Sequence, residues 1–372
     1  MINEDIYDIS SGIRSDSERV AYLYSEVEKK HNRRFLFEPF RVLGQPDFLS
    51  RYSNGENPFP KSIEIDPTNF CNHDCPFCIY SSLHKPGHKE RMKEDKLFEV
   101  ISEAHTLGVE SILFIGGGEP LGHSKTVDAI EYANGLGISV GLVTNGALMR
   151  TRDVGIIKKN ATYVRFSIDS GTADTHKVMH QSNDFNRVIS NLKLVASKPR
   201  KSTIGVSYFI SEVNFHELSL AASLAKSAGA DYIQFKTYAG IGISDNWYSL
   251  LLKEIEKVIT FSGDSFDVHV MENVFNRGAF QSRDYSKCHW QGFKTIIGAD
   301  GNMYLCTQKR GKADAVIGNI YENTLKEIWG SEQRERVVNS IILEKCPFCV
   351  HNTQNKLIEF LGVSGNTHTN FY

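Results

Sequence analysis

The chain has 372 residues, of which 41% are hydrophobic and 23% are charged, an ordinary globular composition. Its 42 basic and 44 acidic residues give a formal net charge of -2 without a long basic block, so a nucleic-acid duplex is not an expected partner. The sequence contains no apolar run of about 18 residues, so no membrane span is predicted, and its length favours one large and one smaller domain.

The sequence contains seven cysteines and no apolar signal region in its polar first 30 residues. An odd number of cysteines without a secretion signal favours metal ligands or reduced thiols over disulfides. We therefore expect a soluble, cytoplasmic protein.

Residues 1–60 are expected to form a helical N-terminal extension in two pieces. Ser15 or Ser17 is a suitable N-cap for a first helix over residues 18–24, and a second amphipathic piece lies near residues 35–48. Residues 54–58 (NGENP) are typical of a linker turn. No function is predicted for this extension.

Three cysteines follow a predicted strand over residues 62–66. Cys71, Cys75 and Cys78 have the spacing CxxxCxxC on one short loop. Three soft ligands suit a four-iron, four-sulfur (4Fe-4S) cluster, in which three thiolates leave one iron open to a small molecule. A zinc site is the alternative, although structural zinc normally takes a nearby fourth Cys or His.

This triad resembles the hallmark of radical S-adenosylmethionine (SAM) enzymes, which is CxxxCxxC with an aromatic residue before the last Cys, here Phe77. The resemblance implies that the triad ligates a 4Fe-4S cluster whose open iron binds SAM, with Phe77 beside the cofactor. Cleavage of SAM would then give a 5'-deoxyadenosyl radical that abstracts hydrogen from an unactivated carbon.

Short β-rich runs and helical patterns alternate from residue 61, which predicts parallel strands with helices packed outside them. Six strands indicate an open barrel, and the resemblance implies the same α/β fold, a partial (β/α)6 TIM barrel over residues 61–240. Active residues are then expected at the C-terminal ends of the strands. The predicted strands are 62–66, 111–115, 139–143, 162–168, 202–209 and 231–235, and the predicted helices are 93–107, 123–136, 184–197 and 215–228.

Several of these strand ends carry residues suited to binding SAM. After the second strand, Gly117 and Gly118 allow close approach of the backbone, and Glu119 can accept from an ammonium group. The resemblance implies that this GGE motif holds the methionine amino group, although a GGG run alone is often only a flexible turn. Thr144 and Asn145 end the third strand, a turn that lies beside the cofactor in similar enzymes.

The fourth strand ends with Ser167 and Asp169, a hydroxyl and a carboxylate two residues apart and so on one face of an extended chain. This pair suits ribose hydroxyls, whereas the structural alternative makes Asp169 or Ser170 an N-cap. His176 and His180 have helical i, i+4 spacing, but without a third ligand a surface or cap role is favoured over a metal site. Similar sequences often have Arg at the position of His180, which leaves the contact to the SAM carboxylate open.

The sixth strand places Gln234 and Lys236 on one face by period-two alternation, as candidates for substrate contact. Lys236 is the first candidate for a general base and Lys309 the second. The alternative for either lysine is a solvated charge.

The other four cysteines, Cys288, Cys306, Cys346 and Cys349, form a second set. Asp300-Gly301 is a good hairpin turn ahead of Cys306. A four-Cys zinc site is possible, but the gaps are long for a zinc ribbon. With Ile317-Gly318-Asn319-Ile320 and the run at residues 325–329 (LKEIW), the order resembles the C-terminal SPASM and Twitch extensions of radical SAM enzymes.

Only four thiols remain for this extension, which implies one auxiliary 4Fe-4S cluster, the Twitch arrangement. We expect a connecting segment over residues 241–285 and a Twitch/SPASM-like iron-sulfur domain over residues 286–372. Four thiolates saturate a 4Fe-4S cluster, so this cluster is better suited to accepting an electron than to gripping substrate.

The resemblance therefore implies SAM and two 4Fe-4S clusters as cofactors and a flavodoxin- or ferredoxin-type reductant as a partner. The first hypothesis is oxidation of a small polar molecule, most like the Twitch dehydrogenases of aminocyclitols and sugars in antibiotic biosynthesis. The alternatives are crosslinking of a ribosomal peptide and redox-neutral dehydration of a sugar diol, with epimerisation ranked third because no cysteine is left over as a hydrogen donor. A structural zinc protein is the non-enzyme alternative.

Overall fold

The computed structural model describes residues 20, 25, 39–83, 89–237, 244–275, 282–346 and 349–362. It has two compact units. The larger unit comprises the described residues of Phe37–Thr144, Leu148–Val164 and Gln281–Tyr372, and the smaller unit those of Met1–Leu36, Asn145–Ala147 and Arg165–Phe280.

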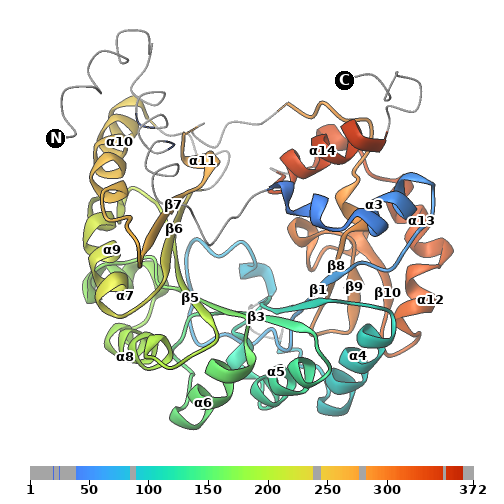
Figure 1. Ribbon diagram of the computed structural model, residues 1–372, viewed down its shortest axis with the longest axis horizontal. Coiled ribbons are helices and arrows are strands. Elements are labelled where there is room, and N and C mark those ends of the chain that lie inside the picture. Colours follow the sequence, from blue (N-terminus) through green and yellow to red (C-terminus); the bar gives the residue numbers. More distant parts are fainter. Residues whose placement is uncertain are drawn as a thin grey trace. The chain divides into compact units, whose positions relative to one another are not determined.

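The larger unit contains the first three predicted strands as neighbours in a parallel sheet. They are β1 (Ser62–Ile65), β2 (Ser111–Phe114) and β3 (Ser139–Thr144), with Ile63 opposite Ile112 and Leu113 opposite Gly141. The helices α4 (Glu94–Thr106), α5 (Thr126–Gly135) and α6 (Thr151–Asn160) lie along the outer side of these strands in Figure 1. Their apolar faces bury side chains such as Ile101 and Ile130 against the sheet, which leaves the strand ends to carry the polar residues.

The C-terminal segment adds three strands to the other edge of this sheet. β8 (Lys294–Ile297) pairs in parallel with β1, and the antiparallel strands β9 (Asn302–Tyr304) and β10 (Val316–Asn319) follow it. The predicted turn is present, with Gly301 at a φ of +82°, a backbone conformation that glycine adopts without strain. The C-terminal helices are α12 (Leu325–Trp329), α13 (Glu332–Asn339) and α14 (Asn352–Gly362).

The N-terminal residues of the larger unit pack against this C-terminal segment. The second predicted helical piece is found as the 3-10 helix η2 (Pro39–Gly44) and α3 (Pro46–Ser53), since proline favours the first turn of a helix and interrupts a longer one. Val42 and Phe48 share an apolar cluster with Phe293 and Ile358. Apart from Val20, the first predicted helix lies outside the described residues.

The smaller unit has its own parallel strands. They follow the order β4-β5-β6-β7, where β4 (Tyr163–Ser167) contributes its last three residues, Ser207 of β5 is opposite Gln234 of β6, and Gln234 is opposite His269 of β7. The outer helices alternate with the strands in sequence, as expected for βα units (Figure 1). The remaining bounds are β5 (Thr203–Phe209), β6 (Tyr232–Lys236), β7 (Asp267–Val270), α7 (Ala173–His180), α8 (Phe185–Ala196), α9 (Leu218–Ser227), α10 (Asp245–Ile259) and α11 (Glu272–Phe275).

All six predicted strands are present, and no strand end differs by more than one residue from the expected one. The elements that were not predicted from the sequence include β7, α6, α7 and α10. Single turns of 3-10 helix complete the described elements: η3 (Ser81–Leu83), η4 (Pro120–Gly122), η5 (Phe215–Glu217), η6 (Trp290–Gly292), η7 (Thr307–Lys309), η8 (Ala313–Ala315) and η9 (Leu343–Lys345). Within the described residues, every helix is too short or too polar to span a bilayer.

Candidate active site and cluster ligands

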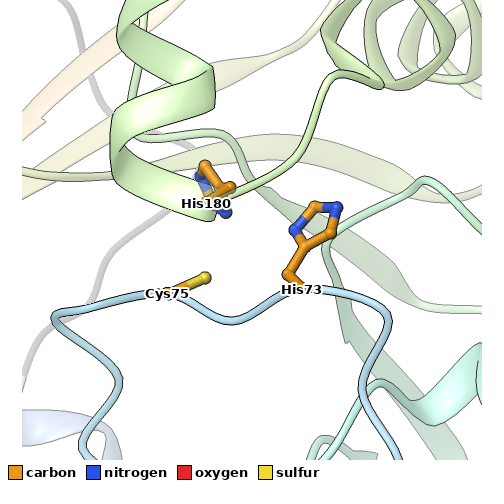
Figure 2. A group of neighbouring side chains, drawn as sticks. All are labelled: His73, Cys75 and His180. Carbon is orange, nitrogen blue, oxygen red and sulfur yellow. The ribbon is translucent and has the colours of Figure 1, made fainter.

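The first cysteine triad lies on the loop that leaves the C-terminal end of β1. Cys71, Cys75 and Cys78 are half-buried thiols, and the amide of Cys78 donates to the carbonyl of Cys75 at 3.1 Å. Figure 2 shows Cys75 on this loop beside the buried His73. Burial raises the pKa of Cys71 to about 12, so its thiolate form requires a cation such as a bound metal. The loop is therefore chemically suited to metal ligation.

The GGGE loop packs directly against the backbone that leads into this triad. The amide of Glu119 donates to the carbonyl of Phe70, next to Cys71, at 2.8 Å. A Cβ on Gly118 would lie 2.3 Å from the same carbonyl oxygen, and a Cβ on Gly117 would lie 2.4 Å from Asn69 Oδ1. Only glycine allows this approach. The two motifs, about 40 residues apart in sequence, thus lie side by side.

Two of the predicted SAM contacts meet at this loop. The hydroxyl of Thr144, at the end of β3, donates to Glu119 Oε1 at 2.5 Å, and the amide of Leu121 donates to the same oxygen at 3.1 Å. Glu119 is only 3% exposed. Both contacts hold the carboxylate at the C-terminal edge of the strands, where a carboxylate can accept from an ammonium group.

In the smaller unit, Asn145 begins a turn and Ser167 ends β4. Asn145 Oδ1 accepts from the amide of Ala147 at 3.0 Å, and Gly146 has a φ of +77°. A Cβ on Gly146 would overlap the ring of Phe166. Asn145 thus stabilises the turn with its own side chain, while Ser167 is half-buried.

Asp169 does not lie on the same extended face as Ser167, contrary to the expectation from the sequence. β4 ends at Ser167, and Asp169 has a φ of +52°, so the period-two alternation stops before it. Asp169 Oδ1 accepts from the amide of Phe209 at 2.6 Å, and burial raises the pKa of Asp169 to about 6. The capping alternative is wrong for both Asp169 and Ser170, because Thr172 is the N-cap of α7.

His176 and His180 are not surface residues. They are 0% and 2% exposed, and their rings stack at 4.4 Å. His180, at the end of α7 in Figure 2, has Nε2 at 2.8 Å from the carbonyl of Ile168 and 3.4 Å from Asp169, while Nε2 of His176 lies 3.1 Å from Asp184. His176 therefore has an acidic partner, Asp184, eight residues later in the sequence. The contact of His180 with the carbonyl of Ile168 connects α7 to the end of β4.

Lys236 and Gln234 lie on β6 as predicted, and the structure adds Arg165 of β4. Arg165 Nη1 donates to Gln234 Oε1 at 3.3 Å. Burial, and then the positive charge of Arg165, lower the pKa of Lys236 to about 8, against a smaller opposing effect of Asp169. Arg165 was missed, although the alternation of buried Val164 and Phe166 with Arg165 already places it on the opposite face of β4.

The four later cysteines line one cavity of about 60 Å³ in the larger unit. This volume is several times what a single water needs. Leu305, Val337 and Ile341 form part of its apolar wall, and burial raises the pKa of Cys288 to about 12, with the neighbouring cysteines adding to the effect. Cys306 and Cys349 also have raised pKa values through burial. Four thiols around one small, largely apolar space fit an iron-sulfur cluster or a zinc ion.

Asn355 of α14 connects the loops that carry two of these cysteines. Its Oδ1 accepts from the amides of His289 and Trp290 at 2.7 and 2.8 Å, directly after Cys288. Its Nδ2 lies 3.8 Å from Cys349 Sγ, a hydrogen bond to sulfur. Nothing in the sequence pattern indicated this residue, because the contact depends on how α14 packs.

A buried charge network joins the two cysteine regions of the larger unit. Arg310, four residues after Cys306, forms ion pairs with Glu64 of β1 and with Asp66, the latter at 2.8 Å between Nε and Oδ2. The guanidinium lies 4.6 Å from the ring centre of Tyr80, two residues after Cys78, and the Tyr80 hydroxyl donates to the carbonyl of Thr307 at 3.4 Å. Burial raises the pKa of Asp66 to about 7 even with Arg310 beside it.

Lys309, the second candidate base, differs from Lys236. Its Nζ lies 2.8 Å from Asp314 Oδ2, and this hydrogen bond raises the pKa of Lys309. The sequence did not indicate this pair.

Comparison with protein-family models identifies two segments. The Radical SAM superfamily model matches residues 65–225, which include the first triad and the GGE loop. The SPASM model, an iron-sulfur cluster-binding domain, matches residues 288–351, which contain all four later cysteines. The chain carries a radical SAM domain followed by a SPASM domain. These two domains imply SAM and 4Fe-4S clusters as cofactors and support an enzymatic activity of the radical SAM type.

Curated relatives of this radical SAM and SPASM chain have several activities. An AdoMet-dependent heme synthase of Methanosarcina barkeri is 22% identical over 78% of this chain and 88% of the relative. A GTP 3',8-cyclase of Clostridium botulinum is 28% identical over 35% of this chain, and the match spans 42% of that enzyme.

Solved structures show the fold. Streptococcus suis SuiB bound to S-adenosylmethionine superimposes with a TM-score of 0.62 at 15% identity, over 86% of this chain and 78% of SuiB. SuiB has also been solved bound to its precursor peptide SuiA. The α/β fold with the parallel sheet of a partial TIM barrel and a C-terminal SPASM domain is thus confirmed.

Proposed function

We propose that this radical SAM enzyme oxidises a small polar substrate, with one auxiliary 4Fe-4S cluster as the electron acceptor. In this proposal Cys71, Cys75 and Cys78 hold the SAM-binding cluster, and Cys288, Cys306, Cys346 and Cys349 hold the auxiliary one. When bound, SAM and the clusters supply a 5'-deoxyadenosyl radical and an acceptor for the electron that the substrate loses. Sugars and aminocyclitols are the substrate class we favour.

The observation that carries the proposal is the cavity lined by all four later thiols. Because these four and the first triad use all seven cysteines, the auxiliary cluster has a full set of protein ligands and no cysteine is left to return a hydrogen atom to the substrate. A saturated cluster favours oxidation over epimerisation. A substrate that gives up a hydrogen atom and an electron must also lose a proton, so the chain needs a base.

Lys236 is the better candidate for that base. A general base must be neutral to accept a proton, and a pKa of about 8 leaves a larger neutral fraction near pH 7 than an ordinary lysine has. Lys309 is held by Asp314 in its ammonium form. The carboxylate of Glu119 suits the amino group of SAM, and the hydroxyl of Ser167 at the end of β4 suits the ribose hydroxyls of SAM.

The test begins with anaerobic reconstitution of the full chain. Two clusters require about eight iron and eight sulfide ions per chain. Two zinc ions per chain without sulfide would refute the proposal that the chain is a radical SAM enzyme. Replacing Cys71, Cys75 and Cys78 together by Ala should abolish release of 5'-deoxyadenosine under strong reduction. The exposed Asp74 on the same loop offers a matched control, since Asp74→Asn should leave release unchanged.

The electron-acceptor role has its own test. Replacing the four later cysteines by Ala should preserve SAM cleavage but stop substrate oxidation. Turnover by this variant would show that the second cluster is not the acceptor.

Peptide maturation is the second candidate, favoured by the likeness to SuiB, which has been solved with a precursor peptide. The two candidates differ in the product. A short precursor peptide encoded beside this gene, and a crosslinked product in mass spectra after incubation with the peptide, would replace the small-molecule proposal.

A further inference from the structure

The inner face of the smaller unit carries two basic side chains that the described residues do not neutralise. Arg165 and Lys236 come from strands separated by β5. Among the described residues, no carboxylate oxygen lies within 4.0 Å of a side-chain nitrogen of Arg165 or Lys236. Arg165 Nε is buried and has no hydrogen-bond partner in the described part of the chain.

Ser207 of β5 is short enough to let Arg165 reach across the sheet. Ser207 is in register with Gln234, and its carbonyl accepts from the amide of Ile168, just beyond β4. Side chains in register point to the same face of a parallel sheet, so the short Ser207 leaves space between Arg165 and Gln234. The 3.3 Å hydrogen bond from Arg165 to Gln234 confirms that the guanidinium crosses β5.

The nearby polar groups already form other hydrogen bonds. Gln234 Oε1 accepts from Arg165, and its Nε2 lies 2.9 Å from Met271 Sδ. Asp169, which affects Lys236 electrostatically, is bonded to the amide of Phe209 and lies beside His180. The buried Nε–H of Arg165 has no partner among the described residues, which is costly, so it requires an acceptor from outside these side chains.

We propose that Arg165 binds an oxyanion of the substrate, a carboxylate or a phosphate, on the inner face of β4–β6. The planar guanidinium can donate two parallel N–H bonds to such a group, which a lysine cannot do. Gln234 fixes one edge of the guanidinium, and Lys236 adds a second positive charge when it is protonated. This inference rests on the proposed function, because it takes this face as the substrate side of the enzyme.

The experiment measures anion binding by calorimetry with the anaerobically reconstituted, SAM-loaded full chain. The probes are inorganic phosphate and succinate, titrated to about 50 mM, a range suited to millimolar dissociation constants. We expect binding that weakens about tenfold in Arg165→Gln, with Arg165→Lys intermediate because charge remains without the fork. Tighter binding of phosphate or of succinate identifies the oxyanion class.

The control is Arg152→Gln, at a side chain that is 72% exposed, which should bind both probes as the wild type does. Circular dichroism and iron content establish that each variant folds and loads its clusters, and Arg165→Lys provides the answer if Arg165→Gln does not fold. Equal binding by wild type and Arg165→Gln, or no binding to the wild type, would overturn the proposal. So would a tenfold loss of SAM affinity in Arg165→Gln with probe binding unchanged. Failure of SAM cleavage alone would leave the binding result intact.

Discussion

At the scale of single residues, Lys236 has a titration that separates it from the surface lysines. Burial and the charge of Arg165 favour its neutral form, so its ammonium should lose its proton near pH 8 instead of near 10.5. In carbon-13 NMR of the reductively methylated protein, one lysine signal should titrate near pH 8 and vanish in Lys236→Gln. In Arg165→Gln that signal should move to a higher pKa, because a repelling charge is gone. Titration of Lys236 above pH 10 in the wild type would contradict its assignment as the base.

Asn355 allows a second test at this scale, directed at the auxiliary site. Its N–H bond to Cys349 Sγ stabilises negative charge on the sulfur, and such bonds raise the potential of iron-sulfur clusters. Asn355→Ala should therefore lower the midpoint potential of the auxiliary cluster by tens of millivolts, on the order expected for one hydrogen bond. EPR-monitored redox titration gives the value. Asn352→Ala on the same helix, whose side chain bonds Tyr285 and Ser282, is the control and should change the potential less.

At the scale of elements, the GGGE loop works because its glycines touch backbone. A Cβ on Gly118 would lie within 2.6 Å of the backbone of Thr68, Asn69 and Phe70, atoms that cannot move without displacing Cys71. Gly118→Ala should lower the free energy of unfolding by about 1–3 kcal/mol and reduce both cluster loading and SAM affinity. Denaturant titration, iron assay and equilibrium binding measure the three effects.

The matched control is Gly155 in α6, where a Cβ would meet nothing within 4 Å. Gly155→Ala should stabilise the protein by about 0.5–1 kcal/mol, since alanine is the better helix residue. If Gly118→Ala and Gly155→Ala change the free energy of unfolding by the same amount, the glycines of the loop are not required for its close packing.

At the scale of the whole molecule, the larger unit brings together segments from both ends of the described chain. Phe48 packs with Phe293 and Ile358, and the neighbouring Tyr52 hydroxyl lies 3.2 Å from Nδ1 of His289, directly after Cys288. The N-terminal segment thus supports the loop that carries Cys288, a proposed cluster ligand. Phe48→Ala should cost about 3–5 kcal/mol in the free energy of unfolding and lower the iron bound in the auxiliary site.

Leu43 in η2 is the control for this prediction, because it is 44% exposed. Leu43→Ala should change stability by less than about 0.5 kcal/mol. Full iron loading by a destabilised Phe48→Ala protein would show that the segment stabilises the unit without shaping the cysteine site.

Local patterns were sufficient for the strands and for the two cysteine sets. Alternating apolar residues, glycine turns and the spacing of Cys71, Cys75 and Cys78 are properties of neighbouring residues, so the six strands and the cluster-binding segments follow from the amino-acid order alone. Helix α6 was missed because Gly155 and several charged residues interrupt its short apolar pattern. Helix α10 has a clear apolar face but lies in the segment that was expected to be a connection.

The errors concern side chains whose partners depend on the folded backbone. His176 and His180 look like polar surface residues in sequence, but Asp184 and the carbonyl of Ile168 satisfy them in the interior. The direction in which the Asp169 side chain points depends on its backbone φ of +52°, which no local sequence pattern predicts.

The sequence by itself therefore determined the two cysteine sets and the GGE loop, because residue type and spacing are local, and the binding of clusters and SAM by these residues stays a prediction. Only the tertiary structure decided that Arg310 joins the two cysteine regions, that Asn355 reaches Cys349 and that Arg165 crosses β5 to Gln234. These contacts join residues brought together by strand order and helix packing, and burial there sets the charge state of each group.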